Sequence, residues 1–156
     1  MAGNRRMTAD RTAADSEQGL VSVHMIRALW TDCDPAGIMF YGTYFRWMDE
    51  ASYYLFKKAG LRWETWKEEL GIIGTPLVTA HCDFRSPVAF GDEVTVRSRI
   101  SEWGRTSMVV THRFAVGDRL TAEGYEKRIW CTGDPADPTT IASAPIPDHV
   151  KARFAG

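Results

Sequence analysis

Two acids that could do chemistry, Asp32 and Asp34, lie two residues apart in the first third of the chain. Pro35 follows them directly, and because proline disfavours helical angles in the residue before it, we expect both acids to lie in a loop. A carboxylate presented by a loop can attack a carbonyl carbon as a nucleophile or take a proton from water as a general base. The same spacing is more often found in acids that only accept hydrogen bonds from loop amides, so spacing alone is weak evidence for catalysis.

The acidic loop leads into a segment whose large apolar residues recur every three or four positions from Tyr41 to Ala59, followed by Gly60. This pattern predicts an α-helix that ends at a glycine. The first turn of a helix has free N–H groups at the positive end of the helix dipole, where a developing oxyanion is stabilised. Gly42 has no side chain and would let a ligand approach closely. If Asp34 faces the N–H groups near Tyr41 and Gly42, it is placed for acyl chemistry.

Familiar catalytic motifs are missing from the sequence. It contains no GxSxG, HExxH, GxxxxGK[ST] or GxGxxG pattern, so a serine hydrolase, a zinc peptidase, a P-loop enzyme and a dinucleotide-binding enzyme lose their sequence support. The three cysteines, Cys33, Cys82 and Cys131, form no CxxC pair, so neither a metal site nor a redox pair is expected. Their odd number and wide spacing suit a reducing cytoplasm.

Composition narrows the class of protein further. The chain has 156 residues, 44% of them hydrophobic, which suits one domain with a substantial core. Its 19 basic and 20 acidic side chains give a net charge of −1, which argues against nucleic acid as a partner. No run approaches the roughly 20 apolar residues of a membrane-spanning helix, so we expect a soluble protein with no membrane partner. The cysteine pattern gives the expectation of a cytoplasmic location. Residues 1–20 indicate a flexible tail, and residues 21–156 a single domain.

The remaining elements are predicted from apolar periodicity. Val21, Val23, Met25 and Ala28 alternate with polar residues and predict a half-buried first strand. A shorter helix is expected after the long one, at 63–70. Four further strands are predicted, separated by turns that contain glycine and aspartate; they lie at 77–84, 94–100, 108–114 and 125–131.

The order of these elements predicts the fold class. Short links favour antiparallel pairing of strands that are neighbours in the sequence. One strand, a long helix and four strands then give an α+β fold in which a single sheet curls round one helix. After residue 134 the Pro and Thr content predicts a loop, and Asp148 could cap a last short helix.

A longer run of residues carries a resemblance to a known family. It consists of Asp32, Cys33, Asp34, Pro35, Ala36, Gly37, Ile38, Met39, Phe40 and Tyr41, then Tyr44, Arg46, Trp47, Asp49 and Ala51. This run resembles the signature of the 4-hydroxybenzoyl-CoA thioesterases of the hotdog superfamily. The similarity continues through residues 59–61, 71–76 and 101–103 and covers roughly 21–147 at the level of element order.

The resemblance implies an antiparallel sheet of about five strands wrapped round a long helix, the hotdog fold, and hydrolysis of an acyl-CoA thioester. It implies that Asp34 is the nucleophile or general base, and that the backbone N–H groups at Tyr41 and Gly42 polarise the thioester carbonyl. It implies no metal or prosthetic group, since CoA is part of the substrate. It also implies a homodimer or homotetramer with the active site at a subunit boundary. Trp63 and Thr75 match the family as substrate-binding residues.

Two departures from the family pattern bear on the substrate. Many relatives that act on short aliphatic acyl-CoA have histidine where this chain has Tyr41, so the tyrosine favours an aromatic acyl group. Enzymes of the aromatic branch tend to have several basic residues after the tryptophan that matches Trp103, whereas only Arg105 is present here. Either the CoA phosphates are held more weakly, or the acyl carrier differs, or another basic residue substitutes (Arg85, Lys127 or Arg128).

Several alternatives remain open at the level of sequence. Asp49 and Glu50 on the helix are rival catalytic acids, because other hotdog branches place their carboxylate there, although a solvated or salt-bridged surface acid is the default. A thioesterase for short or branched aliphatic acyl-CoA or for acyl carrier protein is one alternative function. A non-catalytic acyl-CoA-binding protein is another. The sequence does not distinguish nucleophilic from general-base hydrolysis, dimer from tetramer, or one acyl group from another.

Overall fold

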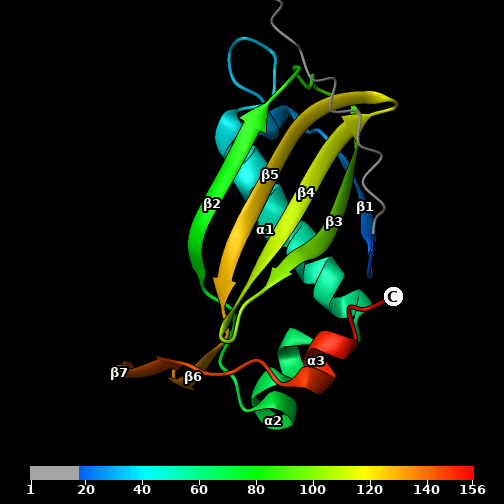
Figure 1. Cartoon of the computed structure of the whole chain (residues 1–156). Coiled ribbons are helices and arrows are strands. Elements are labelled where there is room, and N and C mark those ends of the chain that lie inside the picture. Colours follow the sequence, from blue (N-terminus) through cyan, green and yellow to red (C-terminus); the bar gives the residue numbers. More distant parts are fainter. Residues whose placement is uncertain (1–17) are drawn as a thin grey trace, which may run out of the picture.

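The computed structural model describes residues 18–156, and the predicted tail at 1–20 lies outside them up to residue 17. Five antiparallel strands form a curved sheet in the order β1-β3-β4-β5-β2, and the helix α1 runs along its inner face (Figure 1). This arrangement confirms the predicted α+β class. The strands are β1 (Ser22–Arg27), β2 (Leu77–Phe84), β3 (Glu93–Trp103), β4 (Ser107–Val116) and β5 (Arg119–Ile129).

The predicted long helix is confirmed as α1 (Tyr41–Lys58). Gly60 follows it with φ of +75°, a left-handed conformation that glycine adopts without strain. Trp47 and Met48 are buried together with Phe56, so the helix is covered on more than one face, as expected for a central helix. Within residues 18–156 no helix, α1 included, is both long and apolar enough to cross a membrane.

Helix and sheet approach each other very closely at Gly124 on β5. A Cβ atom at this position would lie 2.6 Å from the His81 carbonyl oxygen and 2.7 Å from the Met48 sulfur. Any larger residue would push α1 away from β5 or displace β2, since neither the backbone nor the packed methionine has room to move. This contact sets the height of the helix above the strands.

The predicted pairing of consecutive strands holds for β3, β4 and β5 but is wrong for β2, which pairs with β5 instead of β3. The link from β2 to β3 therefore crosses the end of the sheet. It is held there because Arg85 and Ser86 donate their backbone N–H groups to the Thr121 carbonyl oxygen, at 2.8 and 3.1 Å. Val88 in the same link is fully buried, so burial of the crossing stabilises this topology.

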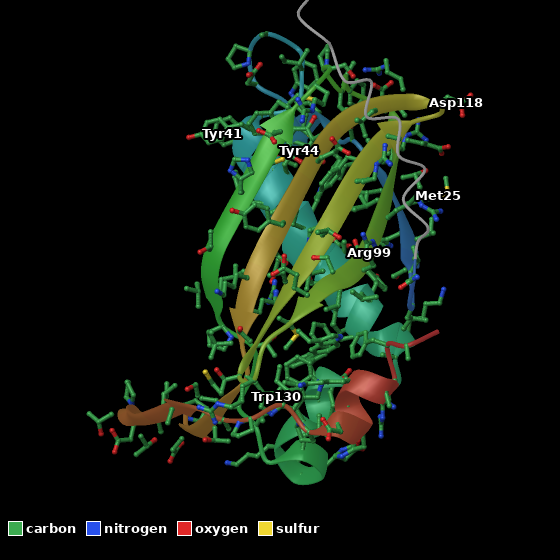
Figure 2. All side chains as sticks on the ribbon, in the orientation of Figure 1. Met25, Tyr41, Tyr44, Arg99, Asp118 and Trp130 are labelled. Atoms are coloured by element: carbon green, nitrogen blue, oxygen red, sulfur yellow. The ribbon has the colours of Figure 1, made fainter. Side chains whose placement is uncertain are left out.

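The first strand is found where it was expected, but the predicted buried face is the wrong one. Val23 and Met25 are exposed, whereas Ser22 is buried and His24 faces α1. The His24 ring stacks on Tyr54 with centroids 4.0 Å apart and lies 3.2 Å from the Glu50 carboxylate. The inner face of β1 therefore carries Ser22 and His24 together with Ile26, which packs against the core, while Val23 and Met25 face outward (Figure 2 labels Met25).

The C-terminal third differs from the prediction in one further respect. The predicted loop after residue 134 is instead part of a two-stranded hairpin, β6 (Cys131–Asp134) and β7 (Asp137–Ser143), which projects from the end of the sheet (Figure 1). The predicted helix at 63–70 divides into η2 (Trp63–Thr65) and α2 (Trp66–Leu70). The short last helix is present as α3 (Asp148–Ala152), with Pro147 rather than Asp148 as its N-cap.

Candidate functional site

The acidic loop is a tight hairpin whose two arms are tied together. Asp34 N–H donates to the Ile38 carbonyl oxygen at 2.9 Å, and Phe40 N–H donates to the Asp32 carbonyl oxygen at 2.8 Å. The short helix η1 (Trp30–Asp32) precedes the loop, and α1 begins directly after it. The cross-links hold the segment that carries Asp34 close to the start of α1.

The two acids of this loop have different environments. Asp32 is buried. Its carboxylate accepts a hydrogen bond from the Leu29 N–H at 2.9 Å and forms an ion pair with Arg46. Asp34 is half-buried, and one of its carboxylate oxygens accepts a hydrogen bond from the Ala36 N–H at 2.8 Å. The contacts of Asp32 therefore hold the loop in shape, while the Asp34 carboxylate keeps hydrogen-bonding capacity for a ligand.

The start of α1 offers hydrogen-bond donors beside this loop. Tyr41 and Gly42 supply the first two N–H groups of the helix, and neither donates to a backbone acceptor within residues 18–156. Such groups carry the positive end of the helix dipole and suit an oxyanion. The expected open space at Gly42 is occupied, because the Phe40 ring lies 2.6 Å from where a Cβ would be. The glycine thus makes room for an aromatic side chain of the protein itself.

A pocket of about 520 Å³ lies elsewhere, between α1, the segment before β2, and the β6–β7 hairpin. Figure 2 shows Tyr41 and Tyr44 near one end of the sheet and Trp130 at the other, and β5 leads to the pocket at the Trp130 end. Its apolar lining comes mainly from aromatic and branched side chains, and its polar lining from an acid, three hydroxyls and a guanidinium. The lining residues used below are Asp49, Ser52, Phe56, Trp66, Thr75 and Arg128.

The polar side of the pocket is an ion-pair network that sequence analysis missed. Arg128 Nη2 lies 2.6 Å from Asp49 Oδ1 and 2.9 Å from Glu126 Oε2, and Arg128 Nη1 donates to the Thr75 carbonyl oxygen at 3.2 Å. The predicted alternation at 125–131 emphasised Tyr125 and Lys127, which face outward. An acid and a base two residues apart on one strand share a face, and that spacing was the available signal.

The network also answers part of the question about phosphate binding. Arg128 is buried and engaged by two carboxylates, so it is not available to hold the CoA phosphates. Arg85 is exposed and lies 3.6 Å from both Asp83 and Glu123. Asp49, the rival catalytic acid, forms a salt bridge with Arg128, as acids on helix surfaces commonly do.

The predicted substrate-binding residues lie in three places. Thr75 is in the pocket wall. Trp63 is 60% exposed on η2 and does not line this pocket, whereas its neighbour Trp66 does and packs edge to face on Phe56 at 5.5 Å. Arg105 is exposed in the turn between β3 and β4. The structure therefore brings Thr75 and Trp66 together and leaves Asp34, Trp63 and Arg105 outside that pocket.

The cysteines are free thiols with little tendency to ionise. Burial raises the pKa of Cys33, and the neighbouring Asp32 and Asp34 raise it further. Burial, with a smaller effect of Asp83, raises the pKa of Cys82 to about 11. Within residues 18–156 no three His, Cys, Asp or Glu side chains are grouped so that they could hold a metal ion. The raised pKa values disfavour Cys33 and Cys82 as nucleophilic thiolates.

Comparison with known proteins gives consistent matches. The family described as Thioesterase-like superfamily matches residues 28–154. The 4-hydroxybenzoyl-CoA thioesterase of Pseudomonas sp. (strain CBS-3) is 43% identical over 82 residues, which are 52% of this chain and 58% of that protein. The match to this curated relative therefore spans somewhat more than half of its length.

Solved structures match over more of the chain. The structure of the 4-hydroxybenzoyl-CoA thioesterase from Pseudomonas sp. strain CBS-3 superposes with a TM-score of 0.77 at 31% identity and covers 85% of this chain and 98% of its own. A gentisyl-coenzyme A thioesterase gives a TM-score of 0.72 at 35% identity, covering 86% of this chain and 100% of its own. Fold and sequence therefore point to the same family.

The buried carboxylate of Glu126 makes the stability of the protein depend on pH. Burial alone would raise its pKa, but the neighbouring His112, the charge of Arg128 and the Ser52 hydroxyl outweigh burial and hold the pKa below the ordinary value of 4.5. Below 4.5 the unfolded chain binds a proton before the folded one does, so this contribution to stability is complete above 4.5 and is lost as pH falls through the folded pKa.

We predict that Glu126→Gln lowers the free energy of unfolding by about 1–3 kcal/mol at pH 7, because it removes the buried partner of Arg128. The difference from the unaltered protein should shrink as the pH falls through the folded pKa of Glu126. Urea unfolding at a series of pH values measures both effects, with the exposed Glu102→Gln as the control. A difference that stays constant from pH 7 into the acid range contradicts the assignment.

Proposed function

The chain belongs to the thioesterase-like superfamily, and from this we propose that it is an acyl-CoA thioesterase that hydrolyses an aromatic acyl-CoA to the free acid and CoA. The observation that carries the proposal is the half-buried carboxylate of Asp34 in a loop tied to the start of α1, where the N–H groups of Tyr41 and Gly42 have no backbone acceptor in the described residues. The relatives named above act on 4-hydroxybenzoyl-CoA and gentisyl-CoA, which are aromatic thioesters.

In the proposed reaction the thioester carbonyl oxygen accepts hydrogen bonds from the N–H groups of Tyr41 and Gly42. Asp34 either attacks the carbonyl carbon, giving a mixed anhydride that water hydrolyses, or takes a proton from the water that attacks. In both routes the carbon–sulfur bond breaks and CoA leaves as the thiol after protonation. In the general-base route the acid gains its second oxygen directly from water; in the anhydride route the acid gains an oxygen from water if water attacks the acyl carbon, and an oxygen of Asp34 if water attacks the aspartyl carbon. We propose no metal or prosthetic group, because a carboxylate and backbone amides supply the required chemistry.

We assign the acyl group to the pocket beside Asp49 and Arg128. Phe56 and Trp66 meet edge to face at 5.5 Å in its wall, and flat aromatic surfaces of this kind complement an aryl ring. The family resemblance assigns Thr75 and Trp63 to substrate binding, and of these two residues Thr75 lines the pocket. Arg105 is assigned to the CoA phosphates, because it is exposed and Arg128 is engaged by its own carboxylates.

The proposed oligomer explains how Asp34 could meet a pocket at the other end of the sheet. Within residues 18–156, β2 is an edge strand that pairs only with β5, and seven of its eight residues are exposed. One end of β2 adjoins Thr75 and Pro76 in the pocket wall, and the other carries Phe84, whose ring centroid lies 5.1 Å from that of Tyr44 in the first turn of α1. Antiparallel pairing of two β2 strands would place the pocket of one protomer beside the Asp34 loop of its partner.

We therefore propose a homodimer formed along β2, which two such dimers could extend to a homotetramer. A cytoplasmic location is part of the proposal, because all three cysteines are free thiols, as a reducing compartment would keep them.

The first prediction tests the catalytic acid. Asp34→Asn should leave circular dichroism and thermal unfolding unchanged and lower kcat by about 10²–10⁴-fold, because the amide can neither attack nor accept a proton. Thiol release from benzoyl-CoA and 4-hydroxybenzoyl-CoA measures the change, and the exposed Asp118→Asn serves as the matched control. Near-normal turnover by the Asp34 variant removes this residue from catalysis. Binding of the esters with no thiol release by the unaltered protein would instead favour a non-catalytic acyl-CoA-binding protein.

The second prediction tests the acyl group. Values of kcat/KM for benzoyl-CoA, 4-hydroxybenzoyl-CoA and phenylacetyl-CoA should exceed those for butyryl-CoA and isovaleryl-CoA, because the pocket wall includes three aromatic side chains. A thiol-release assay over this panel, with an acyl carrier protein thioester added, gives the comparison directly. The protein's own cysteines should react slowly with the reagent that detects released CoA, because the pKa values of Cys33 and Cys82 are raised. Equal or higher kcat/KM for the aliphatic esters would transfer the assignment to the aliphatic class.

The third prediction tests the subunit boundary. Val78→Lys on the exposed face of β2 should shift the protein towards monomer in light scattering after size exclusion, because the substitution places charges at a paired apolar edge. Thioesterase activity should fall in parallel, since each site draws on both chains. Asp118→Lys, in the turn between β4 and β5, is the control (Figure 2). A fully active monomer would exclude a site shared between protomers.

A further inference from the structure

A chain of polar side chains runs from the interior of the sheet to the wall of the pocket. It begins at Ser98 on β3, whose hydroxyl lies 2.8 Å from His112 Nδ1 on β4. His112 Nε2 lies 3.4 Å from Glu126 Oε2, close enough for an electrostatic contact although not in hydrogen-bond geometry. Glu126 Oε2 in turn accepts hydrogen bonds from Arg128 Nε at 3.1 Å and Nη2 at 2.9 Å. Arg128 carries the chain to Asp49 on α1 at 2.6 Å.

This arrangement needs a reason, because charge inside a protein is costly. Glu126 is completely buried and the Arg128 side chain is 9% exposed, so both lose most of their hydration. Well-packed apolar residues of similar size often give equal or greater stability than a buried ion pair. A buried pair is therefore better explained by the geometry that it imposes than by the stability that it adds. Here that geometry ends at the pocket.

The guanidinium of Arg128 is fixed in position by partners on three elements. Glu126 on its own strand holds Nε and Nη2, the Thr75 carbonyl oxygen holds Nη1, and Asp49 on α1 holds Nη2. Ser52, one turn beyond Asp49 on the helix, donates its hydroxyl to Glu126 Oε2 at 2.6 Å. Glu126 is the common point, since it bonds both the strand arginine and the helix serine.

Asp49, at the outer end of this series of polar side chains, would be mobile without its contact to Arg128. The Asp49 side chain is 67% exposed, so without a partner it could take several rotamers. Held by Arg128, its carboxylate is kept at one place in the wall of the pocket, and so is the carbonyl group of Thr75. A pocket that is already ordered before it is filled binds more tightly, because less conformational freedom is lost on binding.

We propose that Glu126 is a positioning residue for the acyl pocket: it fixes Arg128, and through Arg128 it fixes Asp49 and Thr75 in the wall that receives the acyl group. The inference rests on the proposed function, because it takes the pocket to be the acyl site. Glu126 is buried and touches no substrate, so its effect is on substrate binding. The chemical step belongs to Asp34, on a different loop, and is unaffected.

The test compares Glu126→Gln with Glu123→Gln, the same change on the opposite face of the same strand. For 4-hydroxybenzoyl-CoA, Glu126→Gln should raise KM about tenfold and change kcat by less than about threefold, which corresponds to a loss of substrate binding alone. The Kd for a non-hydrolysable benzyl-CoA thioether, measured by calorimetry, should rise by the same factor. Glu123→Gln should change neither. Partial unfolding would lower kcat and leave KM unchanged, which is the opposite pattern.

Arg128→Lys provides a second variant in case Glu126→Gln fails to fold. Lysine keeps the charge, but its single ammonium group cannot bridge Glu126, Asp49 and Thr75 together, so the same rise in KM and Kd is expected. In a double-mutant cycle, Glu126→Gln combined with Asp49→Asn should have no larger effect than the stronger single change, because both act through one chain.

An unchanged KM in both Glu126→Gln and Arg128→Lys overturns the proposal, as do independent, multiplicative effects in the cycle. These outcomes leave the thioesterase assignment intact, because turnover of the unaltered protein and its loss in Asp34→Asn are measured separately. If the unaltered protein does not bind the thioether, the pocket is not the acyl site and this inference fails with that assignment. Binding without turnover defeats the proposed hydrolysis alone.

Discussion

Burial of α1 against the inner face of the sheet is the constraint on which the rest of this structure depends. Trp47, Met48 and Leu55 are withdrawn from water on that face, and the close contact at Gly124 sets how near the helix lies to the strands. Because the helix is rigid, packing it against the sheet also fixes the positions of the groups at its ends and on its sides. Its N-terminal end presents N–H groups, without a backbone acceptor in the described residues, beside the acidic loop, and its side presents Asp49 and Ser52 to the pocket.

The same constraint separates the two parts of the candidate site. The loop with Asp34 lies at the start of α1, whereas the pocket lies past its second turn and beside the far end of β5. A rigid helix cannot bring them together within one protomer. The exposed edge of β2 runs from one part to the other, so the proposed pairing of a second copy along β2 would bring the two parts together. On this account, association and catalysis depend on the same strand.

The interior of the fold combines apolar packing with a line of buried polar groups. Most of the sheet's inner face is apolar, yet His112, Glu126 and Arg128 follow one another across it towards the pocket. The lowered pKa of Glu126 shows that its partners overcome the cost of burial, so the carboxylate remains charged and keeps its hold on Arg128 at neutral pH. The order of these groups therefore extends the rigidity of the core to the wall of the pocket.

The sequence by itself determined the long helix, the five strands of the main sheet and the acidic loop, because these depend on local signals, but it did not reveal the β6–β7 hairpin. The three-to-four spacing of apolar residues fixed α1 to within one residue, Gly60 marked its end, and Pro35 placed Asp34 outside a helix. Only the tertiary structure decided what lies next to what. It placed β2 against β5, turned Val23 and Met25 outward, and buried Glu126 with Arg128. Each of these features depends on contacts with residues distant in the sequence. The periodicity of one segment predicts that it has an apolar face, but not which other segment that face will pack against.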